Sequence, residues 1–132
     1  MPFVKIALLK GKSPAQLKAI ADGVHQALVD TYSVPPDDRF QLIEQYEKDA
    51  FFYDRHYLDI ERTDEVVFIH ILANRWRDTV TKQALYRAIA DRLSGGCGMR
   101  REDIQVFVSN NDSADWSFGN GVAAYVEQAS AQ

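Results

Sequence analysis

The sequence repeats one order of elements twice, and this repeat limits the possible folds more than any other feature. In each half, an apolar strand pattern is followed by a helix pattern and then by a second strand pattern, with an offset of about 64 residues. The first set covers residues 3–9, 14–32 and 39–46, and the second covers residues 66–72, 80–93 and 104–108. Parallel strands joined by one helix form a right-handed β-α-β unit. The chain is therefore expected to contain two such units.

Each predicted helix has a start signal. Ser13 and Gln16 match the capping-box pattern, and Asp78 is suited to cap the second helix. Gly95 and Gly96 are expected to end that helix, because glycine favours helix ends over helix interiors. Both helices carry apolar residues at three- and four-residue steps, which is typical of packing on one side. The pattern predicts a four-stranded sheet with both helices on one face, and an oligomer would cover the other face.

A single domain is expected over residues 1–132, because a chain of this length that is 46% hydrophobic can bury one core. It divides into a β-α-β unit at 2–48, a linking segment at 49–65, a second β-α-β unit at 66–110 and a C-terminal segment at 111–132. The linking segment is too long for a simple turn and carries four aromatic side chains: Phe51, Phe52, Tyr53 and Tyr57. We expect it to pack against the sheet or against a neighbouring subunit.

Composition argues against several classes of protein. The net charge of -4 and the pI near 5.3 disfavour a nucleic-acid partner. The sequence contains no run of about 18 apolar residues, so no membrane span is predicted. The first residues also lack the basic and small-residue features of a secretory signal. We therefore expect a cytoplasmic protein with no membrane partner.

The single cysteine and the three histidines form no site pattern. Cys97 excludes an internal disulfide and is expected to lie in a glycine-rich turn. His25, His56 and His70 lack metal-ligand spacing, and we interpret them as structural residues. No metal and no other cofactor is expected.

Five short features follow one another along the chain. They are Met1-Pro2 before the first strand, the capped helix that follows, Asp38-Arg39-Phe40, Arg75-Trp76-Arg77 and Asp115-Trp116-Ser117-Phe118-Gly119. Together they resemble the tautomerase superfamily, in its malonate semialdehyde decarboxylase-like branch, over about residues 2–121. The resemblance implies an α/β (α+β) tautomerase (MIF-like) fold, assembled as a homotrimer, with a small carboxylate as substrate.

The resemblance also implies the site residues. Pro2 and Asp38 match the catalytic positions of the family. Four residues match its substrate-binding positions: Arg75, Arg77, Trp116 and Phe118. Local alternatives stay open, because the aspartate is also suited to a turn, the arginines to solvent and the aromatic residues to ordinary packing.

Chemistry at Pro2 depends on the residue before it. A proline nitrogen inside a chain is an amide, whereas an amino-terminal proline is a secondary amine that accepts and donates a proton. Chemistry at Pro2 therefore requires the removal of Met1, which a small second residue generally permits.

These roles predict an amino-terminal-proline lyase that decarboxylates a small 3-oxo acid such as malonate semialdehyde, with hydratase activity on unsaturated acids. The nearest alternative is a keto-enol tautomerase of 2-oxo acids, in which neutral Pro2 is the general base. A noncatalytic trimeric binding module is the third alternative.

Overall fold

Four strands form one mixed sheet in the order β2-β1-β3-β4, in a computed structural model that describes residues 2–131 and their side chains through residue 127. β1 (Phe3–Leu9) pairs in parallel with β2 (Gln41–Tyr46) and antiparallel with β3 (Val67–Asn74). β3 pairs in parallel with β4 (Ile104–Asn111). Each parallel pair is one of the predicted β-α-β units, and the predicted four-stranded sheet is confirmed.

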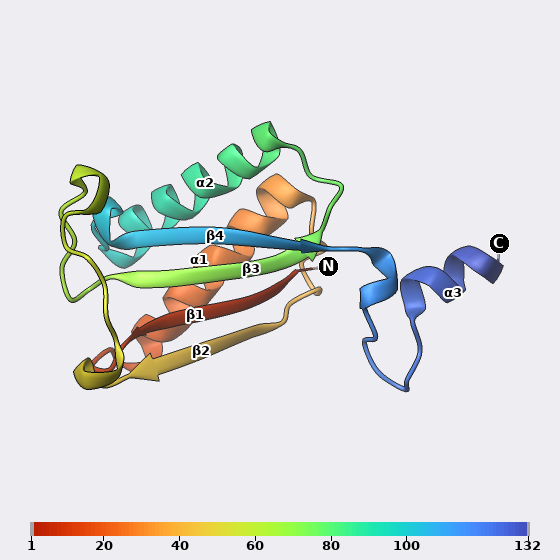
Figure 1. The fold of residues 1–132 in the computed structure, drawn as a ribbon, viewed down its shortest axis with the longest axis horizontal. Helices are drawn as coiled ribbons and strands as arrows, with labels where there is room; N and C mark the ends of the chain where they lie inside the picture. Colours follow the sequence, from red (N-terminus) through yellow and green to blue (C-terminus); the bar gives the residue numbers. More distant parts are fainter. Residues whose placement is uncertain (1, 132) are drawn as a thin grey trace.

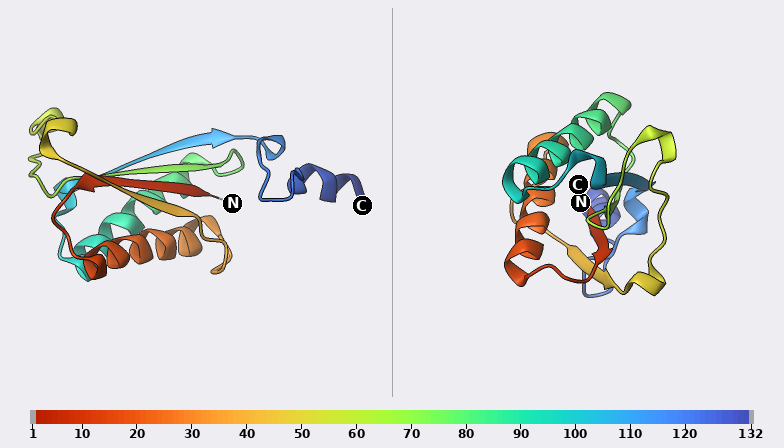
Figure 2. Two further views of the ribbon diagram at one scale, coloured as in Figure 1. Left: turned by 90° about the horizontal axis from the view of Figure 1, so that it is seen from below. Right: turned by 90° about the vertical axis from the view of Figure 1, so that its left-hand side faces the viewer.

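Two long helices, α1 (Pro14–Tyr32) and α2 (Thr79–Cys97), lie side by side on one face of the sheet (Figure 1, Figure 2). Ser13 and Gln16 form the predicted capping box, in which each side chain accepts the backbone N–H of the other residue. Asp78 caps α2 by accepting an N–H from its first turn. The short helical segments are η1 (Lys48–Ala50), η2 (Tyr57–Asp59), η3 (Arg101–Asp103), η4 (Ser113–Asp115) and α3 (Ala124–Ala131).

The core lies between the sheet and the two helices. Alternate residues of β1, which are Val4, Ile6 and Leu8, are at most 1% exposed because the strand period of two turns them all toward the helices. Leu28 of α1 and Leu93 of α2 pack into the same apolar cluster. Burial of each such side chain stabilises the fold by about 1.5 to 3 kcal/mol, so this cluster holds the layers together.

The predicted end of the second helix is wrong. α2 continues through Gly95 and Gly96 and ends at the C-cap residue Gly98, which has the left-handed φ of 66°. Met99 then donates its backbone N–H to the Leu93 carbonyl oxygen, which closes the helix end. Cys97 is accordingly the last helical residue and half-buried, and it does not lie in a turn.

The linking segment packs on the sheet face opposite the helices. Phe51 is buried and stacks on Phe68 of β3, with ring centroids 4.9 Å apart. Asp103, which is fully buried, accepts hydrogen bonds from the backbone N–H and the hydroxyl of Thr63, each at 2.7 Å. Phe52, in contrast, is 84% exposed. One part of the predicted packing is thus formed within the subunit.

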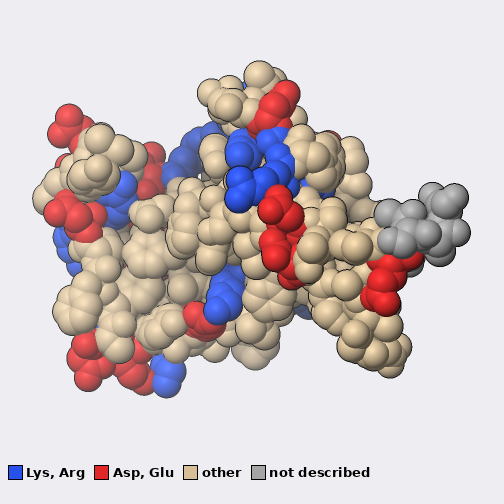
Figure 3. Space-filling view, turned by 45° about the vertical axis from the view of Figure 1, so that its right-hand side comes forward, with Lys and Arg blue, Asp and Glu red and all other residues tan. Residues whose placement is uncertain are grey.

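The rest of that sheet face is open and largely uncharged. Phe40, Leu42 of β2 and Phe107 of β4 are each about half exposed there or at its edge. The space-filling view that turns the right-hand end of the molecule forward shows mostly uncharged surface, with acidic and basic side chains lying against one another (Figure 3). Apolar surface of this extent is typical of an interaction face.

Candidate active site

The sheet register carries Pro2 and Asp38 to the same edge. β1 and β2 run in parallel with Val4 opposite Gln41, and the Val4 backbone N–H donates to the Phe40 carbonyl oxygen at 3.0 Å. Residues that precede two parallel strands emerge at one sheet edge. Pro2, which is buried, therefore lies beside the loop that carries Asp38.

The ends of β3 and β4 reach the same edge. β3 runs antiparallel to β1, with Leu72 opposite Phe3, so β3 ends where β1 begins. Asn74 and Asn111, the last residues of β3 and β4, lie opposite one another. The Trp116 indole N–H is placed to donate to both of their side-chain oxygens, at 2.9 and 2.8 Å. This contact ties the C-terminal segment, which continues from the end of β4 (Figure 1), to the strand ends.

Arg77 is a buried cation at this edge. Its side chain is enclosed, with the residue 6% exposed, and its Nη2 donates to the Tyr32 carbonyl oxygen at 2.9 Å. The guanidinium carbon lies 4.6 Å from the ring centroid of Tyr32 and 3.7 Å from that of Trp76. Burial lowers the pKa of the guanidinium.

Two nitrogens of the same guanidinium, Nε and Nη1 of Arg77, are buried and have no hydrogen-bond partner among the described residues. A buried charge without a full set of partners is costly, and a carboxylate that accepts from a guanidinium fork offsets that cost. Arg77 is therefore suited to bind an anion at the sheet edge.

Asp38 is a half-buried carboxyl group in a turn. Its backbone N–H donates to the Pro35 carbonyl oxygen at 3.0 Å, and its Oδ1 is buried without a partner in the described part of the chain. Burial raises the pKa of this carboxyl, and Asp37 raises it further, whereas the amino-terminal charge, His25 and Arg77 lower it. The turn alternative and the functional alternative are compatible, because the turn leaves the carboxyl group available for proton exchange.

Arg75 lies apart from Arg77. It is exposed and its Nε pairs with Oδ1 of Asp112 at 3.1 Å. In a strand, Arg75 and Arg77 would point to the same face, because one residue separates them. β3 has ended at Asn74, however, and the chain turns before α2 begins. The structure therefore places Arg77 in the buried part of the candidate site and Arg75 on the surface.

Aromatic side chains from the C-terminal segment stand beside these groups. Trp116 and Phe118 stack with ring centroids 5.4 Å apart, and Tyr125 of α3 meets Phe118 edge to face at 5.1 Å. Burial raises the pKa of Tyr125, with Asp38 raising it and Arg77 lowering it, so its phenol faces the same charges. The sequence did not indicate Tyr125, and its only signal was an aromatic residue in the apolar run 122–126.

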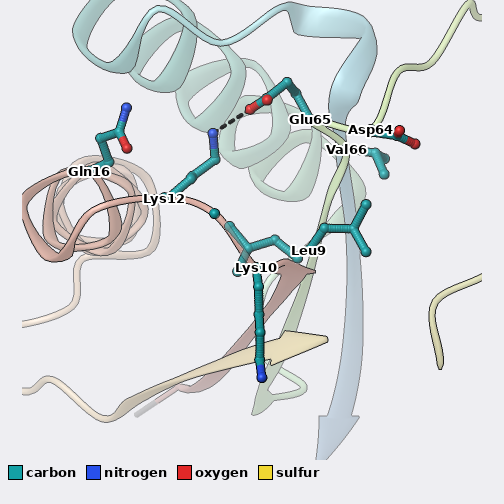
Figure 4. Close-up of a pocket in the computed structure, with 9 residues that line it drawn as sticks. Leu9, Lys10, Lys12, Gln16, Asp64, Glu65 and Val66 are labelled. Atoms are coloured by element: carbon teal, nitrogen blue, oxygen red, sulfur yellow. Dashed lines mark hydrogen bonds and ion pairs between the residues drawn. The ribbon is translucent and has the colours of Figure 1, made fainter. Parts of the chain in front are cut away.

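A separate hollow lies at the opposite end of β1. It has a volume of about 180 Å³ and is lined by residues of the β1–α1 connection and by Asp64, Glu65 and Val66. Lys12 and Glu65 point toward one another and form an ion pair there (Figure 4). The length of β1 places this hollow about 20 Å from Pro2, so it is not part of the candidate site.

The described residues contain no group of three or more His, Cys, Asp or Glu side chains that is arranged to hold a metal ion. None of the helices formed by residues 2–131 is both long and apolar enough to cross a membrane. The expected removal of Met1 concerns a residue that lies outside the described part.

Two models of the tautomerase enzyme family match the chain, one over residues 2–58 and one over residues 38–119. The chain belongs to the tautomerase family. A relative from Bacillus subtilis (strain 168), the probable tautomerase YusQ, is 46% identical over 127 residues, which is 96% of this chain and all of that protein. The protein is accordingly an enzyme of the tautomerase superfamily.

Solved structures of this superfamily share the fold. Malonate semialdehyde decarboxylase has a TM-score of 0.91 at 30% identity, over 96% of this chain and 98% of that one. FG41 malonate semialdehyde decarboxylase, inhibited by 3-bromopropiolate, has a TM-score of 0.90 at 34% identity, over 96% of both chains. A fused 4-OT, described as a symmetric trimer, has a TM-score of 0.74 at 18% identity, over 92% of this chain and 95% of that one. The predicted membership of the superfamily and its fold are thus confirmed.

Proposed function

We propose that this tautomerase-family enzyme is an amino-terminal-proline lyase that decarboxylates a small 3-oxo acid such as malonate semialdehyde. The observation that carries the proposal is the buried Arg77 guanidinium, with two nitrogens left without a partner among the described residues, at the sheet edge where Pro2 and Asp38 lie. This combination offers an anion site beside a proton-carrying amine. The two malonate semialdehyde decarboxylases of similar structure support the same reaction.

In the proposed reaction, Arg77 holds the substrate carboxylate while the cationic amine of Pro2 donates a hydrogen bond to the C3 carbonyl oxygen. The bond between the carboxylate carbon and C2 then breaks, and its electron pair forms an enolate stabilised by the amine. Carbon dioxide leaves. A proton from solvent then adds to C2 of the enolate and gives acetaldehyde, so the reaction converts malonate semialdehyde and one proton into acetaldehyde and carbon dioxide.

Asp38 has a distinct part in this proposal. Its carboxylate keeps the Pro2 amine cationic, because an opposite charge nearby favours the protonated form of an amine. The same carboxylate is suited to activate water, which would allow hydration of an unsaturated acid.

Trp116, Phe118 and Arg75 complete the proposed site. Trp116 and Phe118 stack on one another, and Phe118 is 39% exposed in the single subunit. The pair is proposed to exclude water from the assembled site, which favours a step in which the carboxylate loses its charge. Arg75 stays a proposed second carboxylate ligand, which would have to leave its exposed pair with Asp112 to reach the substrate.

We also propose a homotrimer. The open sheet face carries exposed apolar side chains, among them Leu42 and Phe107, and burial against other subunits would remove them from water. The fused 4-OT of similar fold is a symmetric trimer, which supports this assembly. Sedimentation equilibrium of the purified protein is expected to give three times the chain mass.

One observation favours keto-enol tautomerisation as the second candidate function. The relative that shares 46% of its residues with this chain is described as a probable tautomerase. In this alternative, Pro2 is neutral at pH 7 and moves a proton between carbon and oxygen of a 2-oxo acid. Burial near the Arg77 cation favours a neutral amine, whereas ionised Asp38 opposes it.

The test uses protein whose Met1 is verified by mass spectrometry to be absent. Malonate semialdehyde, phenylpyruvate and 2-hydroxymuconate are compared as substrates, and acetaldehyde is measured with alcohol dehydrogenase. Release of acetaldehyde at a rate well above that of the other two reactions is the expected result. Turnover of the enols without acetaldehyde would overturn the lyase proposal in favour of the tautomerase. No turnover of any of the three would favour a binding module.

A further inference from the structure

We propose that His25 is a positioning residue for Asp38: it holds the loop of that carboxylate against α1 and favours its ionised form. This inference rests on the proposed function, in which Asp38 acts on the Pro2 amine. His25 lies two turns before the end of α1, and the sequence alone indicated only a structural role for it.

The loop before β2 runs back along α1 and is joined to it on both sides of Asp38. Three contacts do this: His25 Nε2 with the Pro36 carbonyl oxygen, Arg39 Nη2 with Asp22 Oδ1, and Gln41 Nε2 with the Ala21 carbonyl oxygen, each at 2.8 Å. The three contacts fix the backbone at both ends of the Asp38 turn. The backbone that carries Asp38 is therefore held at the sheet edge where Pro2 lies.

The His25 contact is part-buried and lies on the side of the turn that precedes Asp38. His25 is only 9% exposed, whereas the side chains of Arg39 and Asp22 are more than a third exposed. Exposed ion pairs contribute little, but this hydrogen bond is costly to break because the buried His25 ring N–H would be left without an acceptor. His25 is thus expected to fix this loop more strongly than the pair with Arg39.

The acceptor determines which ring nitrogen carries the proton. A carbonyl oxygen only accepts, so Nε2 of His25 must be the donor in both the neutral and the cationic ring. A second proton can therefore be added only at Nδ1, and the bond to Pro36 survives the change of charge.

The charges around this turn act on Asp38 in opposite directions. Burial raises the pKa of the Asp38 carboxyl most and Asp37 raises it further, while the amino-terminal charge, His25 and Arg77 lower it. Asp22 and Arg39 are the other charged groups that tie the loop to α1. Removal of the imidazole charge therefore leaves the amino-terminal charge and Arg77 as the cations that oppose the effect of burial on Asp38.

The first experiment measures the titration of Asp38 itself. Carboxyl ¹³C NMR of Met1-free protein is recorded against pH, with Asp38→Asn to assign the signal. His25→Gln retains a donor but cannot become cationic, and His25→Leu lacks both properties. Both variants are expected to raise the pKa of Asp38, and His56→Gln, at an exposed histidine of the linking segment, is not. An unchanged Asp38 titration in both His25 variants would overturn the inference.

The second experiment separates positioning from folding. His25→Leu is expected to lower kcat by about 10- to 100-fold with KM changed by less than about threefold, because a displaced catalytic group slows chemistry more than binding. His25→Gln is expected to restore most of kcat. An equal loss in both variants, or a loss in KM alone, would contradict a positioning role.

The two experiments also separate this inference from the proposed function. Should His25→Leu fail to fold as judged by circular dichroism, the Asp38 titration in His25→Gln still decides the question of His25. Wild-type protein that shows no decarboxylation would refute the lyase proposal, whereas the NMR titration needs no substrate.

Discussion

Replacement of Arg77 by methionine removes the buried cation while keeping a side chain of similar length. A carboxylate bound at this site would lose its charge-assisted hydrogen bond to Arg77, which contributes about 1.5 to 3 kcal/mol to the binding free energy. At about 1.4 kcal/mol for each tenfold change, binding of a small dicarboxylate such as malonate is expected to weaken by about 10- to 150-fold. Arg77→Lys keeps the charge but not the two donors Nε and Nη1, so it is expected to give an intermediate loss.

Isothermal titration calorimetry with malonate measures this effect directly. Arg92→Met is a matched control, because Arg92 forms an exposed ion pair with Asp30 on the outer side of the helices. The control is expected to bind malonate as the wild type does. Equal malonate affinity in wild type and Arg77→Met would refute the assignment of Arg77 to the anion site.

Three further variants test separate parts of the account. Asp38→Asn is expected to lower turnover by at least about 100-fold. Because burial raises the pKa of Asp38 in the folded state, the stability of the wild-type protein falls as the pH rises above the unfolded pKa of about 3.9. Urea unfolding at pH 7 is therefore expected to find the Asp38→Asn variant at least as stable as the wild type. A less stable Asn variant would contradict this. Asp103→Asn is expected to lower the free energy of unfolding by about 1.5 to 3 kcal/mol, because the buried carboxylate accepts two hydrogen bonds from Thr63. A change below about 0.5 kcal/mol in urea unfolding would contradict the anchoring of the linking segment by Asp103. Pro2→Ala is expected to abolish nearly all turnover while sedimentation still finds a trimer, and unchanged turnover would exclude the proposed mechanism.

The sequence predicted those parts of the fold that depend on local signals. Strand alternation predicted β1, and Ser13 and Asp78 predicted the starts of both long helices, because periodicity and capping are properties of neighbouring residues. The end of α2 was predicted wrongly, because Gly95 and Gly96 cost helix stability that tertiary packing supplies elsewhere in α2.

Contacts between distant segments could not be predicted from local patterns. The family resemblance suggested that Arg75 and Arg77 act together, but only the position of the strand end shows that one is buried and the other exposed. The contact of His25 with Pro36 depends on a loop that runs back along α1, and Tyr125 reaches the charged groups only through α3. None of these relationships has a periodic signal in the sequence.

The protonation state of Pro2 is the central claim of the proposed mechanism. It is measured most directly by ¹⁵N NMR of protein labelled at proline and verified to lack Met1, titrated from pH 5 to pH 11. The account predicts that the Pro2 amine is cationic at neutral pH, with a pKa above the value of about 8 that is usual for an α-amine. A pKa below about 7 would contradict carbonyl polarisation by the cation and would assign Pro2 the role of a general base.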